Sequence, residues 1–255
     1  MKRMFFAGLA DGKEQIGMAV LDPIIPLGQP GEWDCAQTSN PCVVGDKLYY
    51  QGKDALGRFR IGLATSKDGF NWEKRGILLE PDDFSYPYRP GYAHPHVIRH
   101  DGGWKIWFSK DTREIWQASS KDGTRWGKPS LVLSSEDELW YPWVIDDDGL
   151  RMWLTRRTNK KISCIEHYDF KGDPRVVLEG SEKYEKRGVS NASVIRTDKY
   201  YMYYQTFDKE CNMRIALAVS DDGLEWAKRG LVLKPFAPWC AQSVADPFIV
   251  DGTAL

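Results

Sequence analysis

The chain is built from one short pattern that recurs along its length. In the clearest copy, residues 94–126, apolar runs at residues 97–98, 104–108 and 115–118 are separated by polar turns that contain Asp and Gly. Short β-rich runs divided by such turns are typical of a small antiparallel sheet made of consecutive hairpins. A chain made of copies of this unit must place several small sheets side by side.

Three further copies open at Asn40, Tyr141 and Asn191, and a fifth is split between the chain ends. In the split copy, residues 246–252 supply a first strand and its turn, while residues 3–8 and 15–20 supply the second and third strands. The copies begin 47 to 55 residues apart, a period that indicates propeller blades of four short strands. We therefore predict an all-β fold, a single-domain five-bladed β-propeller over residues 1–255 with four-stranded antiparallel blades. One blade is closed by the N- and C-terminal strands together, which removes open sheet edges; a β-sandwich or a β-helix would not explain ends that complete each other.

Composition excludes several kinds of partner. Lys and Arg number 35 against 36 Asp and Glu, so no charge bias favours nucleic acid or an anionic membrane. The five Cys lack CxxC spacing, which argues against a disulfide framework or a zinc site and suits reduced thiols in the cytosol. No apolar run reaches transmembrane length. Eleven Trp suit both sheet packing and sugar stacking, so we expect a small-molecule partner, no nucleic acid and no membrane.

A Ser-x-Asp-Gly-x-x-Trp turn closes three of the copies, beginning at Ser66, Ser120 and Ser220. It is similar to the Asp-box of sialidases and other propellers. We expect a structural role, in which Asp and Gly form a tight turn, Ser caps it and Trp packs between neighbouring blades. The third copy has residues 168–172 in its place.

Across the whole chain, the recurring order of x-P-x-V-I, then D-G, then an apolar strand such as Y-Y-M-Y-Y resembles the five-bladed glycoside hydrolases. These include arabinanases, β-xylosidases, invertases and levansucrases, and the likeness is greatest to their small single-domain members. The resemblance implies a glycoside-hydrolase-like enzyme that acts on a small sugar or glycoside in the central channel, without a cofactor. In that family a base, a pKa-modulating Asp and an acid Glu stand at the first-strand starts of successive blades. Asp246, followed by Pro247, matches the base or nucleophile position, whereas Asn40 stands where an Asp is expected and His94 where a Glu is expected.

Two other acids would supply the carboxylate pair that glycoside hydrolysis needs: Asp34, six residues before Asn40, and Glu138, three residues before Tyr141. No metal site is assigned, because His94 and His96 have no further ligands in comparable positions; we expect His94 to act as a hydrogen-bond donor or as an acid or base. The predicted catalytic residues are Asp246, Asp34, Glu138 and His94. The predicted substrate-binding residues, which first-strand starts, second-strand ends and approach loops bring to one mouth, are Asn40, Trp33, Arg89, Tyr141, Asn191, Asp111, Arg156 and Trp239.

Two classes of function remain open at this point. The first is a glycosidase-like enzyme that uses Asp246 and a partner carboxylate. The second is a propeller that has lost the hydrolytic set. Such a protein would bind a ligand without chemistry, or would catalyse proton transfer or cyclisation of a non-sugar metabolite with His94, Tyr141 and acids. The Asn40 and His94 substitutions keep the second class open.

Overall fold

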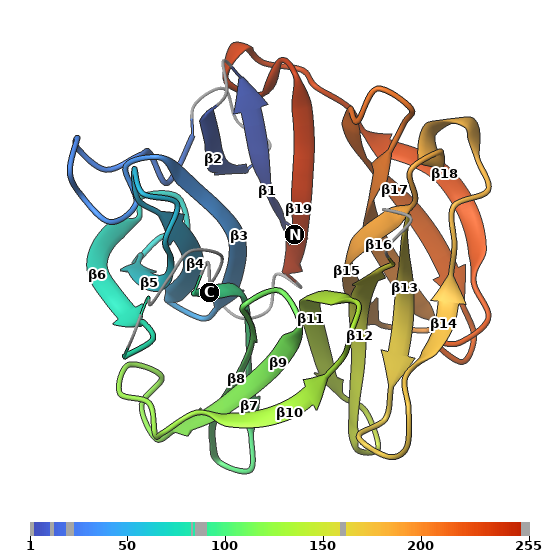
Figure 1. The fold of residues 1–255 in the computed structure, drawn as a ribbon, viewed down its shortest axis with the longest axis horizontal. Helices are drawn as coiled ribbons and strands as arrows, with labels where there is room; N and C mark the ends of the chain where they lie inside the picture. Colours follow the sequence, from blue (N-terminus) through green and yellow to red (C-terminus); the bar gives the residue numbers. More distant parts are fainter. Residues whose placement is uncertain are drawn as a thin grey trace.

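The computed structural model describes residues 3–10, 13–18, 23–82, 84, 91–158 and 162–250. Its strands form groups arranged in a ring (Figure 1), and the predicted all-β propeller is confirmed. The strands of the first two repeats are β3 (Gln37–Val44), β4 (Lys47–Lys53), β5 (Phe59–Thr65), β6 (Glu73–Leu79), β7 (Tyr92–His100), β8 (Gly103–Lys110), β9 (Glu114–Ser120) and β10 (Ser130–Ser134). Those of the next two are β11 (Glu138–Asp146), β12 (Leu150–Arg157), β13 (Ser163–Tyr168), β14 (Arg175–Leu178), β15 (Val189–Arg196), β16 (Tyr200–Phe207), β17 (Met213–Ser220) and β18 (Ala227–Leu233). The chain ends supply β1 (Arg3–Ala10), β2 (Lys13–Met18) and β19 (Ser243–Val250).

Backbone hydrogen bonds join the described strands into four sheets, where five blades were predicted. The difference arises because one parallel pair, Glu14 with Gln37, links β19-β1-β2 to β3-β4-β5-β6 in a single seven-stranded sheet. Each predicted repeat is nevertheless present as its own group of strands. The inner strands β3, β7, β11, β15 and β19 contact one another in turn, and β19 contacts β3. The group at the chain ends contains three described strands, not the predicted four.

The two ends of the chain close one blade together, as predicted. β1 and β19 pair antiparallel, from Arg3 opposite Val250 to Leu9 opposite Ser243. Figure 1 shows the two strands, blue and red, side by side. Because the pairing satisfies the backbone groups along one side of each strand, neither carries an open edge there.

The Ser-x-Asp-Gly-x-x-Trp turns satisfy their own hydrogen bonds. In the first turn, Ser66 Oγ accepts the Gly69 N–H at 2.8 Å, and Asp68 Oδ1 accepts the N–H groups of Phe70 and Asn71 at 2.8 Å each. The same contacts recur in the turns that begin at Ser120 and Ser220. The side chains are therefore occupied in holding the turn, in agreement with the structural interpretation.

Each turn tryptophan packs against the second strand of the preceding repeat. Trp72 meets Phe5 edge-on with 6.2 Å between ring centroids, and Trp226 meets Trp153 at 6.4 Å. In the third repeat, which lacks the turn, Phe170 lies 6.2 Å from Trp107 of the preceding repeat. The packing between neighbouring repeats is thus kept even where the motif is lost.

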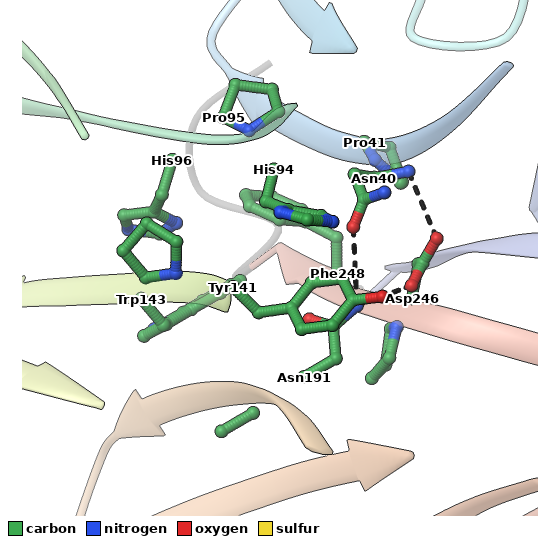
Figure 2. A pocket seen from close by; sticks show the side chains of 13 residues that line it. Asn40, Pro41, His94, Pro95, His96, Tyr141, Trp143, Asn191, Asp246 and Phe248 are labelled. Atoms are coloured by element: carbon green, nitrogen blue, oxygen red, sulfur yellow. Dashed lines mark hydrogen bonds between the residues drawn. The ribbon is translucent and has the colours of Figure 1, made fainter. Parts of the chain in front are cut away.

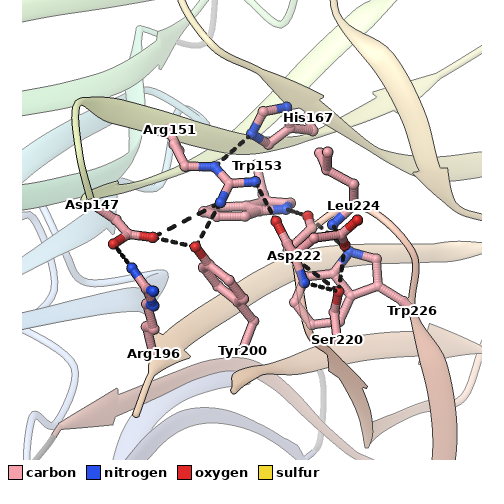
Figure 3. Close-up of polar contacts among 11 residues, drawn as sticks. Asp147, Arg151, Trp153, His167, Arg196, Tyr200, Ser220, Asp222, Leu224 and Trp226 are labelled. Atoms are coloured by element: carbon pink, nitrogen blue, oxygen red, sulfur yellow. Dashed lines mark hydrogen bonds and ion pairs between the residues drawn. The ribbon is translucent and has the colours of Figure 1, made fainter. Parts of the chain in front are cut away.

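Polar contacts add to this packing between the third and fourth repeats (Figure 3). Arg151 on β12 donates to the Tyr200 hydroxyl and to the Asp222 carbonyl, both at 2.7 Å. Asp147 binds Arg196 and the same Tyr200 hydroxyl. Arg151 therefore anchors the turn at the end of β17 to the third repeat, and Asp147 ties β15 and β16 to the same repeat.

The two helices of the described residues, η1 (Lys183–Glu185) and η2 (Pro238–Cys240), are single 3-10 turns. Within the described part of the chain, no helix has the length and apolar character needed to cross a bilayer.

Candidate functional site

The five inner strands share an irregularity at the residues that were predicted to start them. In β3, Ser39 pairs with Gln51 and Cys42 with Tyr49, so that the two residues between are skipped by the ladder. The same two-residue bulge interrupts β7, β11, β15 and β19. The strands begin two or three residues earlier than predicted, and the expected starts lie inside them.

Every one of these bulges contains a residue in the left-handed backbone region, a conformation that non-glycine residues rarely adopt. The φ angles range from 46° to 55°, at Asn40, His94, Tyr141, Asn191 and Asp246. Proline follows in four of the five bulges, and its missing N–H removes no ladder donor because that position is unpaired. A bulge re-aims the side chain it contains, and here all five line one narrow cavity of about 20 Å³ (Figure 2), room for about one water molecule.

Polar side chains from the preceding repeat accept the bulge N–H groups. The His94 N–H donates to Gln51 Oε1 at 3.2 Å, and the Asp246 N–H donates to Gln205 Oε1 at 3.2 Å. Both glutamines occupy the same position on the second strand of the repeat before. This position explains why a polar residue interrupts an otherwise apolar strand, since a buried N–H without a partner would cost stability.

The repeat made from the chain ends offers no such acceptor, because the corresponding residue of β1 is Ala7. The Asn40 N–H instead donates to Asp246 Oδ2 at 3.3 Å. Asp246 Oδ1 accepts a second bond, from Asn191 Nδ2, at 2.5 Å. The Asp246 carboxylate is thereby fixed across the channel by two neighbouring blades (Figure 2).

Burial controls the charge of Asp246. The residue is 4% exposed, and burial raises its pKa to about 6 even though the bonds from Asn191 and Asn40 favour the charged form. A carboxyl group with a pKa near 6 exchanges its proton close to neutral pH. Such a value suits a general base or acid.

His94 stays neutral over the same pH range. Its Nδ1 lies 3.0 Å from Ser109 Oγ, its ring lies 4.0 Å from that of Tyr141, and burial lowers its pKa to about 3. His96 uses its ring differently, because Nε2 contacts the Val144 carbonyl at 2.8 Å. Within the described residues, no group of three or more His, Cys, Asp or Glu is placed to hold a metal ion.

A wider pocket of about 360 Å³ opens above the narrow cavity and shares Asn40, His94, Tyr141 and Asp246 with it. The volume lies within the range of small-molecule sites. Amide, hydroxyl, carboxylate, guanidinium and indole groups face it, a set suited to a hydroxyl-rich ligand. They belong to Gln51, Ser109, Asp111, Trp140, Arg157 and Gln205.

The structure brings six of the predicted site residues to this channel: Asp246, His94, Asn40, Tyr141, Asn191 and Asp111. Asp34, expected to reach the mouth, does not line it. The whole residue is only 1% exposed. Its carboxylate binds Lys74 Nζ at 2.7 Å and accepts a hydrogen bond from the Tyr50 hydroxyl at 3.0 Å. The Trp33 ring packs beside the Tyr50 ring and directly over Gly52. A Cβ atom at position 52 would lie only 2.1 Å from the Trp33 ring, so Gly52 leaves the space that this ring fills. Both residues support the β3–β6 sheet.

Glu138 and Arg156 also lie away from the pocket walls. Glu138 is paired across the sheet with Arg157, with 3.5 Å between Oε2 and Nε. Arg156 turns to the other face and binds Glu166 at 3.0 Å and Asp137 at 3.5 Å. Arg157, the next residue along the strand, lines the pocket instead.

Two further predictions lie outside the described part of the structure, namely Arg89 and the side chain of Trp239. Sequence reasoning missed several pocket residues, among them Gln51, Ser109 and Gln205. Three of them were marked by a signal in the sequence, a polar residue at the same position of an otherwise apolar second strand, in Y-Y-Q, W-F-S and Y-Y-Q.

Comparisons with known proteins place the fold. No protein-family model matches the chain. The uncharacterized protein Rv1502 of Mycobacterium tuberculosis is 29% identical over 212 residues, which cover 66% of this chain and 69% of that protein. Among solved structures, a thermostable family-43 glycoside hydrolase has a TM-score of 0.62 at 20% identity, covering 75% of this chain and 72% of that one.

Two further solved structures extend the likeness. An endo-arabinase from Bacteroides thetaiotaomicron has a TM-score of 0.59 at 16% identity, over 75% of this chain and 79% of that one. A structure described as a glycoside hydrolase has a TM-score of 0.63 at 14% identity, over 92% of each chain. At these identities the likeness concerns the fold, and at that level the predicted resemblance to propeller glycoside hydrolases is confirmed.

Proposed function

We propose that this chain, which has the β-propeller fold of glycoside hydrolases, acts on a small sugar or glycoside. The substrate would bind in the wider pocket, with Asp246 as the carboxylate that exchanges a proton. One observation carries the proposal: Asp246 lies between the narrow cavity and the wider pocket, nearly fully buried, with a pKa raised to about 6. A base is most effective when its pKa is close to the working pH. Asp246 therefore takes the role that the family resemblance gives to the Asp-Pro position.

Glycoside hydrolysis requires a second carboxyl group on the other side of the reacting bond. Asp111 is the partner that the structure favours, because it lines the same pocket as Asp246. Glu138, the partner favoured by sequence, lies behind Arg157. The two are separated by Asp111→Asn and Glu138→Gln, assayed on aryl glycosides with poor and good leaving groups. The variant that removes the acid loses much less rate on the good leaving group, which needs little protonation.

The remaining groups suit the binding of a sugar. The Trp140 ring offers a flat apolar surface, of the kind on which sugar rings stack. His94 is neutral and uses Nδ1 on Ser109, which leaves Nε2 as the ring nitrogen for a ligand hydroxyl. These residues fix a substrate relative to Asp246 without changing charge near neutral pH.

A second function is favoured by the same channel. His94 stands where the resemblance expects an acid, and its lowered pKa of about 3 makes it a poor proton donor at neutral pH, because almost none of it is protonated there. A protein with this channel and no second working carboxyl group would bind sugars without hydrolysing them, or would act on another hydroxyl-rich metabolite. The two functions differ in turnover, not in binding.

The decisive experiment is a turnover assay on a panel of aryl α- and β-glycosides, arabinosides and xylosides among them, with the wild type and two variants. Asp246→Asn removes the proposed base. Asp148→Asn is the matched control, because Asp148 has a similar φ of 52° but lies in an exposed turn. Turnover that is lost in the first variant and kept in the second supports the hydrolase. Sugar binding without turnover by the wild type supports the binding protein, and turnover that is unaffected by Asp246→Asn refutes the proposed role of Asp246.

A further inference from the structure

A smaller pocket of about 130 Å³ adjoins the wider pocket and lies between the third and fourth repeats. The two pockets share Trp140, Arg157 and Phe207, so a ligand in one can extend into the other. Arg187 and Ser190 are among the residues that line only the smaller one. Its volume is below the usual range for a whole ligand and is suited to one substituent of a larger molecule.

Two buried polar atoms in this pocket have no hydrogen-bond partner among the described residues. They are Ser190 Oγ, on a residue that is 2% exposed, and Trp140 Nε1. Buried polar atoms are nearly always satisfied in folded proteins, and leaving one unpaired costs free energy. Because both residues line the smaller pocket, a small shift of either side chain would bring its unpaired atom to a ligand bound there.

The charged residues among those that line the smaller pocket are two arginines, Arg157 and Arg187. Arg187 is exposed at its edge, and no described residue forms an ion pair or hydrogen bond with its guanidinium group. Arg157 forms an ion pair with Glu138 at 3.5 Å, which is too long for a strong hydrogen bond, whereas Arg187 has no such partner among the described residues. No carboxylate is among the described residues that line this pocket, whereas Asp111 and Asp246 both line the wider one.

We infer that the smaller pocket is a subsite for an acidic group of the substrate, a carboxylate or a phosphate, and that the substrate is therefore an acidic sugar or glycoside. The inference rests on the proposed function. The Arg187 guanidinium and the Trp140 indole N–H are donors without acceptors among the described residues, Arg157 is held only at 3.5 Å by Glu138, and a serine hydroxyl can donate as well. Guanidinium groups beside further donors are a combination that oxyanions bind well.

The arrangement also orients the substrate. Thr155, in the smaller pocket, accepts the Asn191 N–H at 2.9 Å, and the Asn191 side chain donates to Asp246 at 2.5 Å. The acidic group is held beyond Trp140 and Arg157, away from Asp111 and Asp246, so that like charges stay apart. The uncharged part of the sugar is left to face Asp246.

Binding measurements test this subsite directly. Titration calorimetry at low salt would compare matched pairs of acidic and neutral sugars: glucuronate with glucose, galacturonate with galactose, and arabinose 5-phosphate with arabinose. At least one acidic sugar should bind tenfold or more tightly than its neutral partner, and the pair that shows the preference tells a carboxylate from a phosphate. If no acidic sugar binds more tightly than its neutral partner, the inference is wrong.

Variants show whether the preference comes from this pocket. Arg187→Gln should reduce it to threefold or less, and Ser190→Ala should weaken binding of the acidic sugar at an unchanged melting temperature, because Ser190 Oγ has no partner within the described residues to lose. Arg229→Gln, on the exposed outer strand β18, is the matched control and should keep the preference. An acidic preference that survives Arg187→Gln would place the site elsewhere and overturn the assignment.

Turnover separates this inference from the proposed function. In assays of aryl uronides against neutral aryl glycosides, the acidic-to-neutral ratio of kcat/KM should fall tenfold or more in Arg187→Gln. An acidic binding preference without any turnover would leave the subsite standing and refute the hydrolase. Turnover that requires Asp246 but shows no preference for acidic substrates would support the hydrolase and refute the acidic subsite.

Discussion

Two features repeat around the ring, and they repeat in different ways. The Ser-x-Asp-Gly-x-x-Trp turns carry the same residues each time and make the same hydrogen bonds to themselves. The five bulges carry the same backbone geometry but different side chains, two Asn, one His, one Tyr and one Asp. A repeat that keeps both chemistry and geometry serves the fold, whereas one that keeps only the geometry presents varied chemistry to a shared cavity.

The aspartates of the two features show the contrast most clearly. Backbone N–H groups of Asn71 and Phe70 hold the pKa of Asp68 well below its ordinary value, in an exposed turn. At the channel, burial raises the pKa of Asp246 to about 6. The same carboxyl group is locked in its charged form at one site and poised to exchange a proton at the other.

The largest expected effect comes from removing a bulge together with its strand. A chain that ends after Val244 loses most of β19, exposes the edge of β1 and opens the ring. It should show no cooperative melting by circular dichroism, while a chain that ends after Val250 keeps the transition. Near-normal melting of the shorter chain would contradict the closure of the ring by β19.

Asp246→Asn should lower turnover by about 10³-fold. The folded state raises the pKa of Asp246 from 3.8 to about 6, so it binds a proton more tightly than the unfolded chain does between those values. Wild-type stability should therefore fall as pH rises from about 4 to about 6, by on the order of 3 kcal/mol, and the variant should lack this dependence. Urea unfolding at pH 4.5 and 7.5 measures it, and an unchanged slope in the variant would contradict the burial argument.

The pH profile of the rate should follow Asp246 and not His94. If charged Asp246 is the base, the rate rises about tenfold per pH unit below about 6 and then levels off. His94→Gln should cost about tenfold in rate, through a lost hydrogen bond, and leave that midpoint in place because the pKa of His94 is about 3. A midpoint that disappears in His94→Gln would assign the titration to the imidazole.

The smallest effect is expected for the turns. Ser220→Ala leaves the Gly223 N–H without its acceptor and should cost about 1 kcal/mol, or about 2–4 °C in Tm, with unchanged turnover. Ser190→Ala is the counterpart near the channel. It removes a hydroxyl that has no partner within the described residues and should leave Tm unchanged. Equal losses of stability in both variants would contradict the proposed difference between the turns, which serve the fold, and the channel residues, which serve the site.

The repeat made much of this predictable from sequence. Its period located the inner strands, and the chemistry of their aligned residues singled out Asp246, Asn40 and His94. The bulges themselves were not foreseen, since a skipped pair leaves no mark on hydrophobic alternation beyond the proline that follows.

Residues outside the repeat were predicted less well. Asp34 lies close to Asn40 in sequence, but its direction is set by Lys74, 40 residues later on β6. Arg156 and Arg157 are adjacent on one strand and face opposite sides, and the phase of that alternation depends on the pairing with Glu138 and Leu139. Contacts between distant segments decide such cases, and a short pattern does not contain them.

The pairing of β1 with β19 has a consequence for folding kinetics. The partners are separated by nearly the whole chain, so their contact bears the largest loop-closure entropy in the molecule and should form late. During synthesis, β1 emerges long before β19 and must wait with an unpaired edge that favours misassociation. Because β19 carries Asp246 and follows all the other described strands in the chain, the channel stays incomplete until β19 is made, and no earlier intermediate contains a finished site.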